Sequence, residues 1–428
     1  MTHFPLSSAQ RAVRALHDAD PTRRRQSTRR IFEVRGPLDV EALGRAAEAL
    51  VLRHEPLRTV YPSEDRQVIR SEAHQVLHVV LERQPWVTFD LAHGPLLSIS
   101  VQPLGPDHHE ISFCVHLLAA DGWSMQVLFD DLSALYRAEV LGGAAALPEL
   151  AIQYVDWAAW HAGRVTPERR AEVRRWWRGA LADYPRPWGS GSTPAPGSGR
   201  RRAVNLAPGV VSAIRALANS SGHTAFTLLA AACAVALTCR NRQDRLLLGL
   251  AVANRDHVAV ERLLGFFVTM SVLPVDLSGD PRFSELMRRV AEATAAVYAH
   301  RELSFPDIAS DWDAPAGAEV GPVMPVIFAH HPPSTVGTLA LDSCEITELP
   351  VFDTAKFGLT VRAQDAADGA CDVWAEYDTS LHNDREIDTL LECYETVLVV
   401  ACEDPPISAL RSRAESEDAG ARTGAAMN

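Results

Sequence analysis

Residues 111–132, ISFCVHLLAADGWSMQVLFDDL, combine a strand, a turn and the start of a helix. Apolar residues dominate up to His116, as expected for a largely buried strand. The pair Asp121-Gly122 is a turn signal, and apolar residues at helical spacing follow it. Asp121 is placed to cap that helix or to pair with an arginine and hold the loop rigid. This strand–turn–helix unit predicts an α/β fold and makes His116 a candidate for chemistry.

His116 and its neighbour Leu117 offer different chemistry at the end of this strand. Successive side chains of a strand point to opposite faces, so only one of the two can face a given cleft. His116 in a cleft would be a candidate general base. Leu117 in the same place would make that part of the wall inert. On residue type alone, a single histidine at a strand end is more often structural than catalytic.

The rest of the sequence also mixes the two periodicities. Helical spacing and strand-like runs occur on both sides of a central break, and this pattern predicts two α/β sandwiches, each a sheet with helices packed on it. The predicted helices are residues 6–19, 39–54, 123–143, 151–165, 167–181, 224–240, 283–302 and 384–404, and the predicted strands are 96–104, 109–118, 245–252, 266–277, 323–330, 357–364 and 371–378.

The chain length and one composition break predict the domain organisation. A chain of 428 residues exceeds one ordinary core, so two domains are expected. Residues 184–202 are rich in Pro, Gly and Ser and poor in aliphatic residues, as in a linker. We therefore expect an N-terminal lobe over 1–183, a linker over 184–202 and a C-terminal lobe over 203–411. The small, polar residues 412–428 predict a disordered tail.

Charge, hydropathy and cysteine usage exclude several classes of function. A formal charge of −13 argues against a general nucleic-acid binder. The arginine runs at 23–25 and 200–202 indicate solvated loop clusters or, alternatively, contacts for an acidic partner or a phosphate. No apolar run is long enough to span a membrane, and no secretory signal is recognisable. Seven scattered cysteines without a C-x-x-C pair indicate reduced thiols, no metal site and a cytoplasmic protein.

The segment HLLAADGWS, residues 116–124, resembles the H-H-x-x-x-D-G signature of the condensation domains of nonribosomal peptide synthetases, within the chloramphenicol acetyltransferase-like superfamily. Further segments resemble family motifs in the family's order, so the resemblance extends over about residues 4–405. These are FPLSSAQRAVRAL, RHEPLRTVY, YVDWAAWH, RRWWRGAL, VANRD, GFFVTMSVLPVDLSGDPRFSELMRRVAEAT, HRELSFPDI and TAKFGLTVRAQD.

This resemblance implies a fold and a reaction. The fold would be two chloramphenicol acetyltransferase-like lobes in a V-shaped pseudo-dimer with a central tunnel. Carrier proteins would present acyl thioesters on phosphopantetheine at both ends of the tunnel. The second histidine of the motif would position or deprotonate the attacking nitrogen, ordinary general-base work. The aspartate would pair with an arginine and fix the histidine loop.

The family's site residues map onto this sequence one by one. The first histidine falls on His116, and the aspartate and glycine fall on Asp121 and Gly122. Arg255, in the segment ANRD, is the arginine expected to pair with Asp121. Arg58 is a second candidate structural arginine.

The sequence departs from the family pattern at the second histidine, where Leu117 stands. Leucine has no proton to transfer and no hydrogen bond to donate. Thr269 also stands where the family usually has asparagine, and Gly358 where aspartate is common. His330 and His331 replace a glutamine-like residue. If another side chain supplies the missing base, the candidates are His116, Ser124, His330 and His331; the side chains expected along the tunnel are Trp123, Thr269 and His330.

Three interpretations follow, from two different classes of function. The leading interpretation is a free-standing condensation-type protein of antibiotic or other secondary-metabolite biosynthesis. It would form an amide or ester from a carrier-bound thioester and a nucleophile, and that nucleophile could be a small molecule. The alternative is a non-catalytic domain that docks carrier proteins or recruits a tailoring enzyme. An acyltransferase that uses a soluble donor such as coenzyme A is a third interpretation.

The implied partners are proteins that come in trans. The chain contains nothing resembling an adenylation domain or a carrier's phosphopantetheine site, so acyl or peptidyl carrier proteins would be separate molecules. No cofactor is expected to be bound, because the phosphopantetheine belongs to the carriers. The family pattern predicts a monomer, and the charge and hydropathy predict neither nucleic-acid nor membrane partners.

Overall fold

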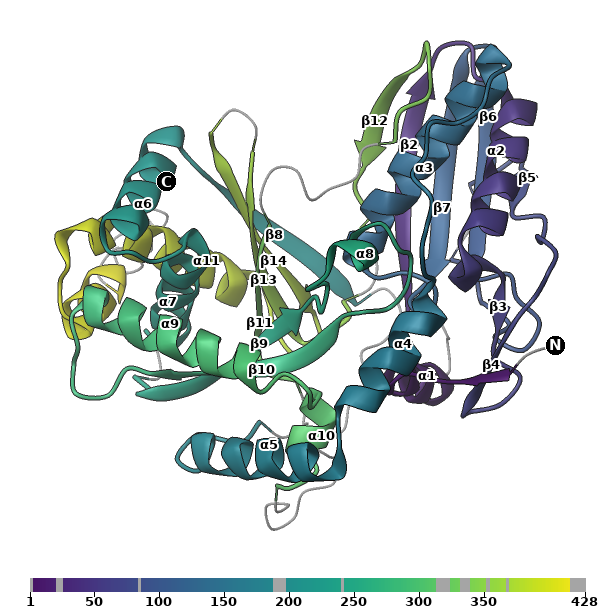
Figure 1. Cartoon of the computed structure of the whole chain (residues 1–428). Coiled ribbons are helices and arrows are strands. Elements are labelled where there is room, and N and C mark those ends of the chain that lie inside the picture. The colour runs from purple at the N-terminus through teal and green to yellow at the C-terminus, as the bar shows by residue number, and fades with distance from the viewer. Residues whose placement is uncertain are drawn as a thin grey trace. The chain divides into compact units, whose positions relative to one another are not determined.

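The computed structural model describes residues 3–20, 26–83, 86–187, 198–239, 242–312, 324–331, 339–351, 355–366 and 369–415 (Figure 1). The chain forms two compact units. Unit 1 comprises Met1–Thr166, Ala253–Val268 and Ser334–Val351. Unit 2 comprises Pro167–Val252, Thr269–Pro333 and Phe352–Asn428.

Unit 1 is built on a five-stranded sheet in the order β12-β2-β7-β6-β5. All neighbouring strands are antiparallel except β5 and β6. Figure 1 shows two helices on one face of this sheet. The core between the sheet and these helices contains Phe32, Phe113 and Phe129, which are in edge-to-face contact. The strands are β2 (Ser27–Arg35), β5 (Leu77–Val79), β6 (Leu97–Gly105), β7 (His108–His116) and β12 (Glu345–Leu349), and the helices are α2 (Val40–Arg53) and α3 (Gly122–Leu141).

The remaining elements of unit 1 include a second, smaller sheet. A three-stranded sheet has the order β1-β4-β3. Helix α1 (Ser8–Ala19) begins with a capping box, in which Ser7 and Gln10 satisfy each other's backbone N–H groups. The other elements are β1 (His3–Pro5), β3 (Thr59–Val60), β4 (Arg66–Ile69), the 3₁₀ helix η1 (Glu55–Arg58), α4 (Tyr154–Arg164) and the short α8 (Val258–Glu261).

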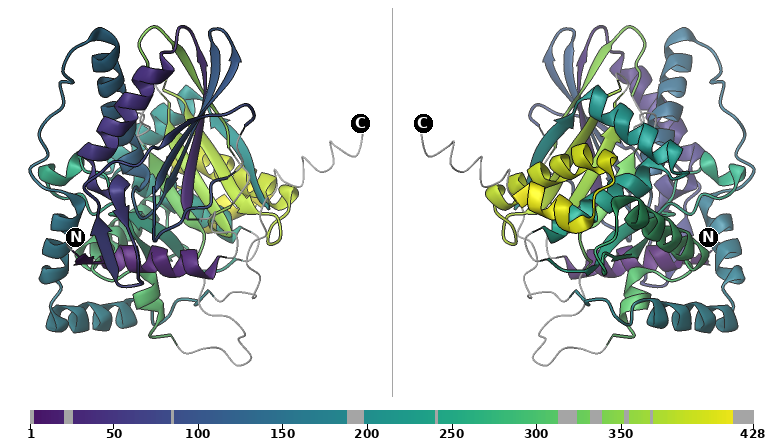
Figure 2. Two further views of the ribbon diagram at one scale, coloured as in Figure 1. Left: turned by 90° about the vertical axis from the view of Figure 1, so that its right-hand side faces the viewer. Right: turned by 90° about the vertical axis from the view of Figure 1, so that its left-hand side faces the viewer.

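Unit 2 contains a six-stranded sheet in the order β10-β9-β11-β13-β14-β8. Figure 2 shows helices gathered on one side of it, and most residues of the apolar helix α7 are buried in their shared core. The strands are β8 (Gly199–Leu206), β9 (Arg245–Val252), β10 (Thr269–Asp276), β11 (Ile327–His331), β13 (Leu359–Asp365) and β14 (Cys371–Asp378), and the helices are α5 (Pro167–Ala180), α6 (Pro208–Ser220), α7 (Ala225–Thr238), α9 (Phe283–Ala299), α10 (Phe305–Ala309), α11 (Asp384–Val400) and η2 (Ala401–Glu403).

The units divide the chain differently from the boundaries expected from composition. The first segment of unit 1 ends at Thr166, before the expected linker. Residues 253–268 and 334–351, from the second half of the chain, also belong to unit 1. Residues 199–202 belong to β8, because they pair with β14, although composition placed them in a linker. Residues 412–415 continue a helix that begins at residue 407, although they were expected in a disordered tail.

The arginine run at 200–202 lies in a strand and has acidic and aromatic partners. Arg200 contacts Asp384 and Arg202 contacts Asp388, whereas the guanidinium of Arg201 lies 4.1 Å from the ring centre of Trp374. The run at 23–25 falls outside the described residues. Within the described ranges no single helix has the length and apolarity of a membrane span, although the bent pair α6 and α7 passes that test together.

Candidate functional site

The turn between β7 and α3 is organised by Asp121. Its Oδ1 accepts a hydrogen bond of 2.8 Å from the backbone N–H of Ser124, which caps α3. Its Oδ2 accepts one of 3.0 Å from the backbone N–H of Phe267. The carboxylate therefore joins the start of α3 to the segment 253–268, although 146 residues separate Asp121 from Phe267.

Arg255 forms an ion pair with Asp121 within unit 1. Its Nη2 lies 3.1 Å from Asp121 Oδ1, and both side chains are almost completely buried. Its Nη1 donates to the carbonyls of Val260 and Leu263 at 2.7 and 2.9 Å. Burial lowers the pKa of Arg255, and Asp121 opposes that shift. The cation is thus held by a counter-ion and two carbonyls, so it clamps residues 253–268 onto α3.

The hydroxyl of Ser124, one of the candidate bases, is hydrogen-bonded within this clamp. The Oγ lies 2.8 Å from Asp121 Oδ1, 2.8 Å from the carbonyl oxygen of Gly265 and 2.8 Å from Arg255 Nη2. It also accepts a 3.1 Å hydrogen bond from the backbone N–H of Gly265. One hydroxyl has one proton and two lone pairs, so these contacts use all of its capacity. Ser124 is completely buried.

His116 is completely buried at the end of β7, and both of its ring nitrogens are engaged. Nδ1 accepts a hydrogen bond of 3.1 Å from the backbone N–H of Leu118. It must therefore be unprotonated, which puts the proton of the neutral ring on Nε2. Nε2 lies 3.1 Å from Nδ1 of the buried His17 on α1, so His116 donates to His17. These contacts orient the ring and hold the strand end against α1.

Three other residues of the motif lie in less enclosed positions. Leu117 is half-buried and packs against the edge of the unit 1 core. Gly122 is exposed, and a Cβ at this position would meet nothing within 4 Å. Trp123 is 41% exposed, and its Nε1–H donates to the carbonyl of Glu261 at 2.9 Å. Leu117 therefore shares the turn with a glycine and with an indole whose N–H is already bonded.

Arg58 makes its contacts in another part of unit 1. Its Nη1 donates to the carbonyl of Arg70, next to β4, and its Nη2 lies 3.6 Å from Glu55. It therefore holds η1 against the small sheet. Its described partners do not include Asp121.

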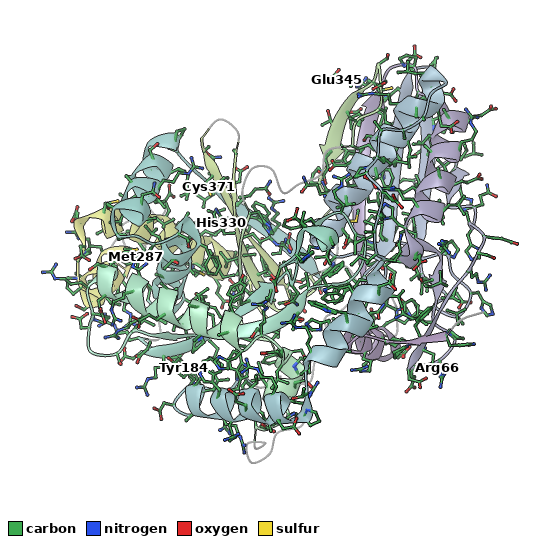
Figure 3. The ribbon with its side chains drawn as sticks, viewed as in Figure 1. Arg66, Tyr184, Met287, His330, Glu345 and Cys371 are labelled. Carbon is green, nitrogen blue, oxygen red and sulfur yellow. The ribbon has the colours of Figure 1, made fainter. Side chains whose placement is uncertain are left out.

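The remaining candidates lie in unit 2. Thr269 begins β10, and Gly358 precedes β13. His330 and His331 end β11, and Figure 3 marks His330. His330 Nε2 lies 3.4 Å from Asp365 Oδ1, and the geometry does not make a hydrogen bond. Burial, with Arg362 nearby, lowers the pKa of His331 to about 4, so this ring is neutral at pH 7.

A second buried charge network, which no sequence motif indicated, supports the same segment. Asp131, on α3, is completely buried. It accepts hydrogen bonds from His54 at 2.9 Å and from Arg53 at 2.8 Å, and it also contacts Arg262. Burial lowers the pKa of His54 despite the aspartate, so the ring is neutral. The sequence carried one sign of this network. Asp131 falls at a core position of the predicted helix, and a buried aspartate requires charged or hydrogen-bonding partners.

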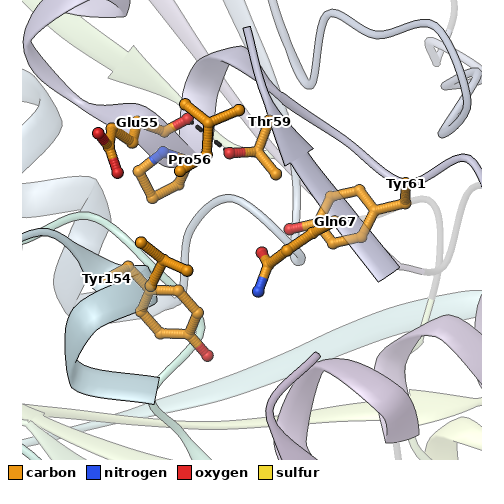
Figure 4. Close-up of a pocket in the computed structure, with 8 residues that line it drawn as sticks. Glu55, Pro56, Thr59, Tyr61, Gln67 and Tyr154 are labelled. Carbon is orange, nitrogen blue, oxygen red and sulfur yellow. Dashed lines mark hydrogen bonds between the residues drawn. The ribbon is translucent and has the colours of Figure 1, made fainter. Parts of the chain in front are cut away.

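One small pocket lies in unit 1, lined by Glu55, Tyr61, Gln67 and Tyr154 among others (Figure 4). Its polar side chains have partners around it: Thr59 donates to the carbonyl of Glu55, and Gln67 and Tyr154 bond to Gln10 and Ser7 at the start of α1. The pocket is thus residual space in a polar network. Among the described residues no group of three His, Cys, Asp or Glu side chains is arranged to hold a metal ion.

Comparison with known proteins gives one family. The model of the Condensation domain matches residues 1–412. Malpibaldin synthetase of Mortierella alpina is 31% identical over 80% of this chain, and isonitrile lipopeptide synthase of Mycobacterium tuberculosis is 30% identical over 94%. The chain spans only 7% and 17% of these two proteins, respectively.

Solved structures match over nearly the whole chain. The X-domain from teicoplanin biosynthesis, in its complex with OxyB, has a TM-score of 0.83 and 25% identity and covers 96% of both chains. The first condensation domain of the calcium-dependent antibiotic synthetase, with a substrate analogue, has a TM-score of 0.78 and 18% identity over 95% of this chain and 98% of its own. The second likeness concerns the fold alone, a mixed α/β fold with chloramphenicol acetyltransferase-like lobes. With the family model covering residues 1–412, this chain belongs to the Condensation domain family.

Proposed function

We propose that this chain is a non-catalytic condensation-type domain of a natural-product assembly line, which recruits a tailoring enzyme to carrier-bound intermediates. The observation that carries the proposal is the chemistry of the turn from His116 to Ser124. Leu117 has no polar atom, and both nitrogens of His116 are engaged in hydrogen bonds. The hydroxyl of Ser124 is saturated by its neighbours. General-base work needs a group within hydrogen-bond reach of the substrate, and these residues offer none.

The similarity to the teicoplanin X-domain supports the same proposal. That domain was solved in complex with OxyB, and this chain is 25% identical to it over 96% of both chains. A second structure of the X-domain has 26% identity and a TM-score of 0.83. We infer that this chain also assembles with a protein partner, and that carrier proteins bring the intermediate to the complex.

The clamp around Asp121 has a natural place in a recruitment domain. It fastens residues 253–268 to α3 through buried contacts and exposes none of its polar atoms as a reactive group. Such a clamp keeps the surface of unit 1 in a fixed shape whether or not the domain catalyses. Its presence therefore supports an intact fold. Whether the domain catalyses depends on the position of Leu117 and not on this clamp.

A catalysis assay tests the proposal directly. A neutral amine can attack a thioester when both are only held together, so the decisive quantity is the rate relative to the uncatalysed background. Purified chain is mixed with an acyl-loaded carrier protein and an amine acceptor from the same gene neighbourhood, and amide product is measured by mass spectrometry. We expect no rate above the uncatalysed background. Product formation well above background by the wild-type chain would overturn the proposal.

The variant Leu117→His extends this assay. Product formed by Leu117→His and not by wild type would mean that the substrates reach this position and only the base is missing. This result agrees with a recruitment domain that descends from an enzyme. A binding assay with the tailoring enzymes encoded beside this chain forms the second half of the test, and failure of all of them to bind would count against recruitment.

A further inference from the structure

We propose that the buried histidines His17 and His116 act as a proton switch. They hold the turn after β7 to α1 while both rings are neutral, and they release it when the pair takes up one proton. This inference goes beyond the proposed function and does not depend on it. The proton switch consists of His17, His116 and the backbone N–H of Leu118. His116 is completely buried and His17 is 2% exposed, so a charge on either ring could not be hydrated in place.

The hydrogen bonds assign every proton of the neutral pair. His116 Nδ1 accepts from the N–H of Leu118 at 3.1 Å, and His116 Nε2 lies 3.1 Å from Nδ1 of His17. His116 therefore has its proton on Nε2 and donates it to His17, whose own proton is then on its Nε2. The two Nδ1 atoms have no proton, and each of them accepts a hydrogen bond.

An added proton must break one of these two hydrogen bonds. On Nδ1 of His116 it would face the N–H of Leu118 directly. On Nδ1 of His17 it would face the N–H of His116, and that contact is restored only if His116 carries its proton on Nδ1 instead of Nε2. Both routes therefore place an N–H of His116 against the N–H of Leu118. Because the two nitrogens are only 3.1 Å apart, the turn must then move away from the ring.

The neighbouring strand offers an acceptor to the released ring. Ser27 lies directly opposite His116 in the pairing of β2 with β7. Its side chain is completely buried, and its Oγ has no hydrogen-bond partner among the described residues. Directly opposed residues of an antiparallel pair share a face and have Cβ atoms about 5 Å apart. The hydroxyl of Ser27 is therefore within reach of a protonated His116 that has turned from Leu118, and the switch has two hydrogen-bonded states.

The carbonyl of Leu118 is held by a second link to α1, which does not titrate in the range of histidine. It accepts from the hydroxyl of Tyr61 at 3.3 Å, and that hydroxyl accepts from Gln10 Nε2 at 3.0 Å. Burial raises the pKa of Tyr61, so the hydroxyl keeps its proton. Acid therefore frees the N–H of Leu118 and leaves its carbonyl fixed. The release is confined to the turn that carries Leu117.

Charged groups around the pair affect the pH at which it takes up the proton, and not which hydrogen bonds the proton breaks. Asp20, a buried residue directly after α1, donates its backbone N–H to the carbonyl of His17. The ring of Phe89 contacts His116 edge-to-face. Further ionisable groups on the segments that contact the pair are Arg14 with Asp18 on α1, Arg29 with Ser112 on β2 and β7, the buried thiol of Cys114 on β7, Asp90 with His93 after Phe89, and Asp121 with Arg255 at the turn.

Hydrogen exchange of the full chain tests the switch. The protection factor of the Leu118 amide is measured by NMR between about pH 8 and about pH 5, a range that includes the ordinary histidine pKa of about 6.5. We expect this factor to fall about tenfold per pH unit below the pH of release, the slope of a step that takes up one proton. Interior amides of α3, such as that of Leu128, should stay protected. A factor that does not change over this range, or amides of α3 that exchange in parallel, would refute the switch.

Substitutions of the two histidines distinguish a proton switch from simple support. In His116→Asn, the side-chain oxygen takes the place of Nδ1 and accepts from Leu118 but binds no proton, so protection should persist and lose its pH dependence. His17→Gln keeps an acceptor for His116, whose proton should stay on Nε2, as read from the nitrogen chemical shifts of the ring. His17→Leu removes that acceptor. The proton of His116 should then move to Nδ1, and Leu118 should lose protection about tenfold even at neutral pH, the equivalent of one hydrogen bond.

The matched control is Tyr61→Phe, which removes the hydroxyl that holds the carbonyl of Leu118 and leaves both histidines in place. It should lower the protection of Leu118 by a similar factor at every pH and keep the slope with pH. The switch is overturned if His116→Asn retains the wild-type pH dependence, or if Tyr61→Phe abolishes it. Circular dichroism confirms that each variant folds, and His116→Asn with Tyr61→Phe decides the question if His17→Leu does not fold.

Discussion

The buried pair of Asp121 and Arg255 makes the sharpest prediction about the stability of unit 1. The variant Asp121→Ala removes the cap of α3, which costs about 1 kcal/mol on its own. It also leaves Arg255, whose side chain is 2% exposed, without its counter-ion. Removing one partner of a buried ion pair typically costs ~3–5 kcal/mol. We therefore expect the free energy of unfolding of unit 1 to fall by about 4 kcal/mol.

The assay is urea unfolding followed by tryptophan fluorescence and circular dichroism. Because a chain of two units need not unfold in one step, the transition of unit 1 is analysed separately. Arg255→Met and the double variant complete the cycle, and we expect the double variant to lose about 2 kcal/mol less than the sum of the single variants. The control is Asp130→Ala, which removes a 38% exposed partner of Arg262 and should cost no more than about 1 kcal/mol. A loss below about 1 kcal/mol for Asp121→Ala, or additive single variants, would refute the clamp.

Three further predictions follow from individual contacts. Gly265→Ala should destabilise unit 1 by at least about 2 kcal/mol, because its Cβ would lie 2.1 Å from the Tyr154 ring at a φ of +155°; Gly122→Ala, with open space around it, should be neutral or stabilising in the same urea unfolding assay. Ser124→Ala should cost ~1–3 kcal/mol in urea unfolding, since it leaves a buried arginine hydrogen bond unmade. The low pKa of His331, about 4 against an ordinary value near 6.5, means that the unfolded chain binds this proton first. Stability relative to His331→Gln should therefore be unaffected above pH 6.5 and decline between pH 6.5 and pH 4 by up to roughly 3 kcal/mol, and a flat difference across that range would contradict the burial of this ring.

Local patterns were sufficient to predict the long elements. The expected strand at 245–252 coincides with β9, and the expected helices at 283–302 and 384–404 agree with α9 and α11 apart from their last residues. The apolar residues within each of these segments follow the full period of a helix or a strand. The segment alone is therefore enough to predict the element. The family resemblance also selected Arg255 as a partner for Asp121, which local pattern alone would not have done.

The sequence did not predict elements that exist only through long-range pairing. Strand β12 is mostly exposed and lacks alternation, and it forms because Leu349 and its neighbours pair with β2 near Ile31. The contact of His17 with His116 joins residues 99 positions apart. Neither residue carries a local sign of the other. The motif alone therefore could not decide whether His116 is free to act or engaged.

Because unit 1 is made of three separate segments of the chain, it cannot finish folding until late in synthesis on the ribosome. Strand β12 and the residues that carry Arg255 and Arg262 belong to unit 1, yet they are encoded after a large part of unit 2. About 185 residues separate Thr166 from Val351, which is roughly 10–40 s of synthesis at typical elongation rates. During that interval the nascent unit 1 has an unpaired edge at β2 and, at first, an unneutralised Asp121. A gene fragment that stops at the apparent midpoint of the sequence would preserve this unfinished state, and chaperones should bind it more strongly than the complete chain.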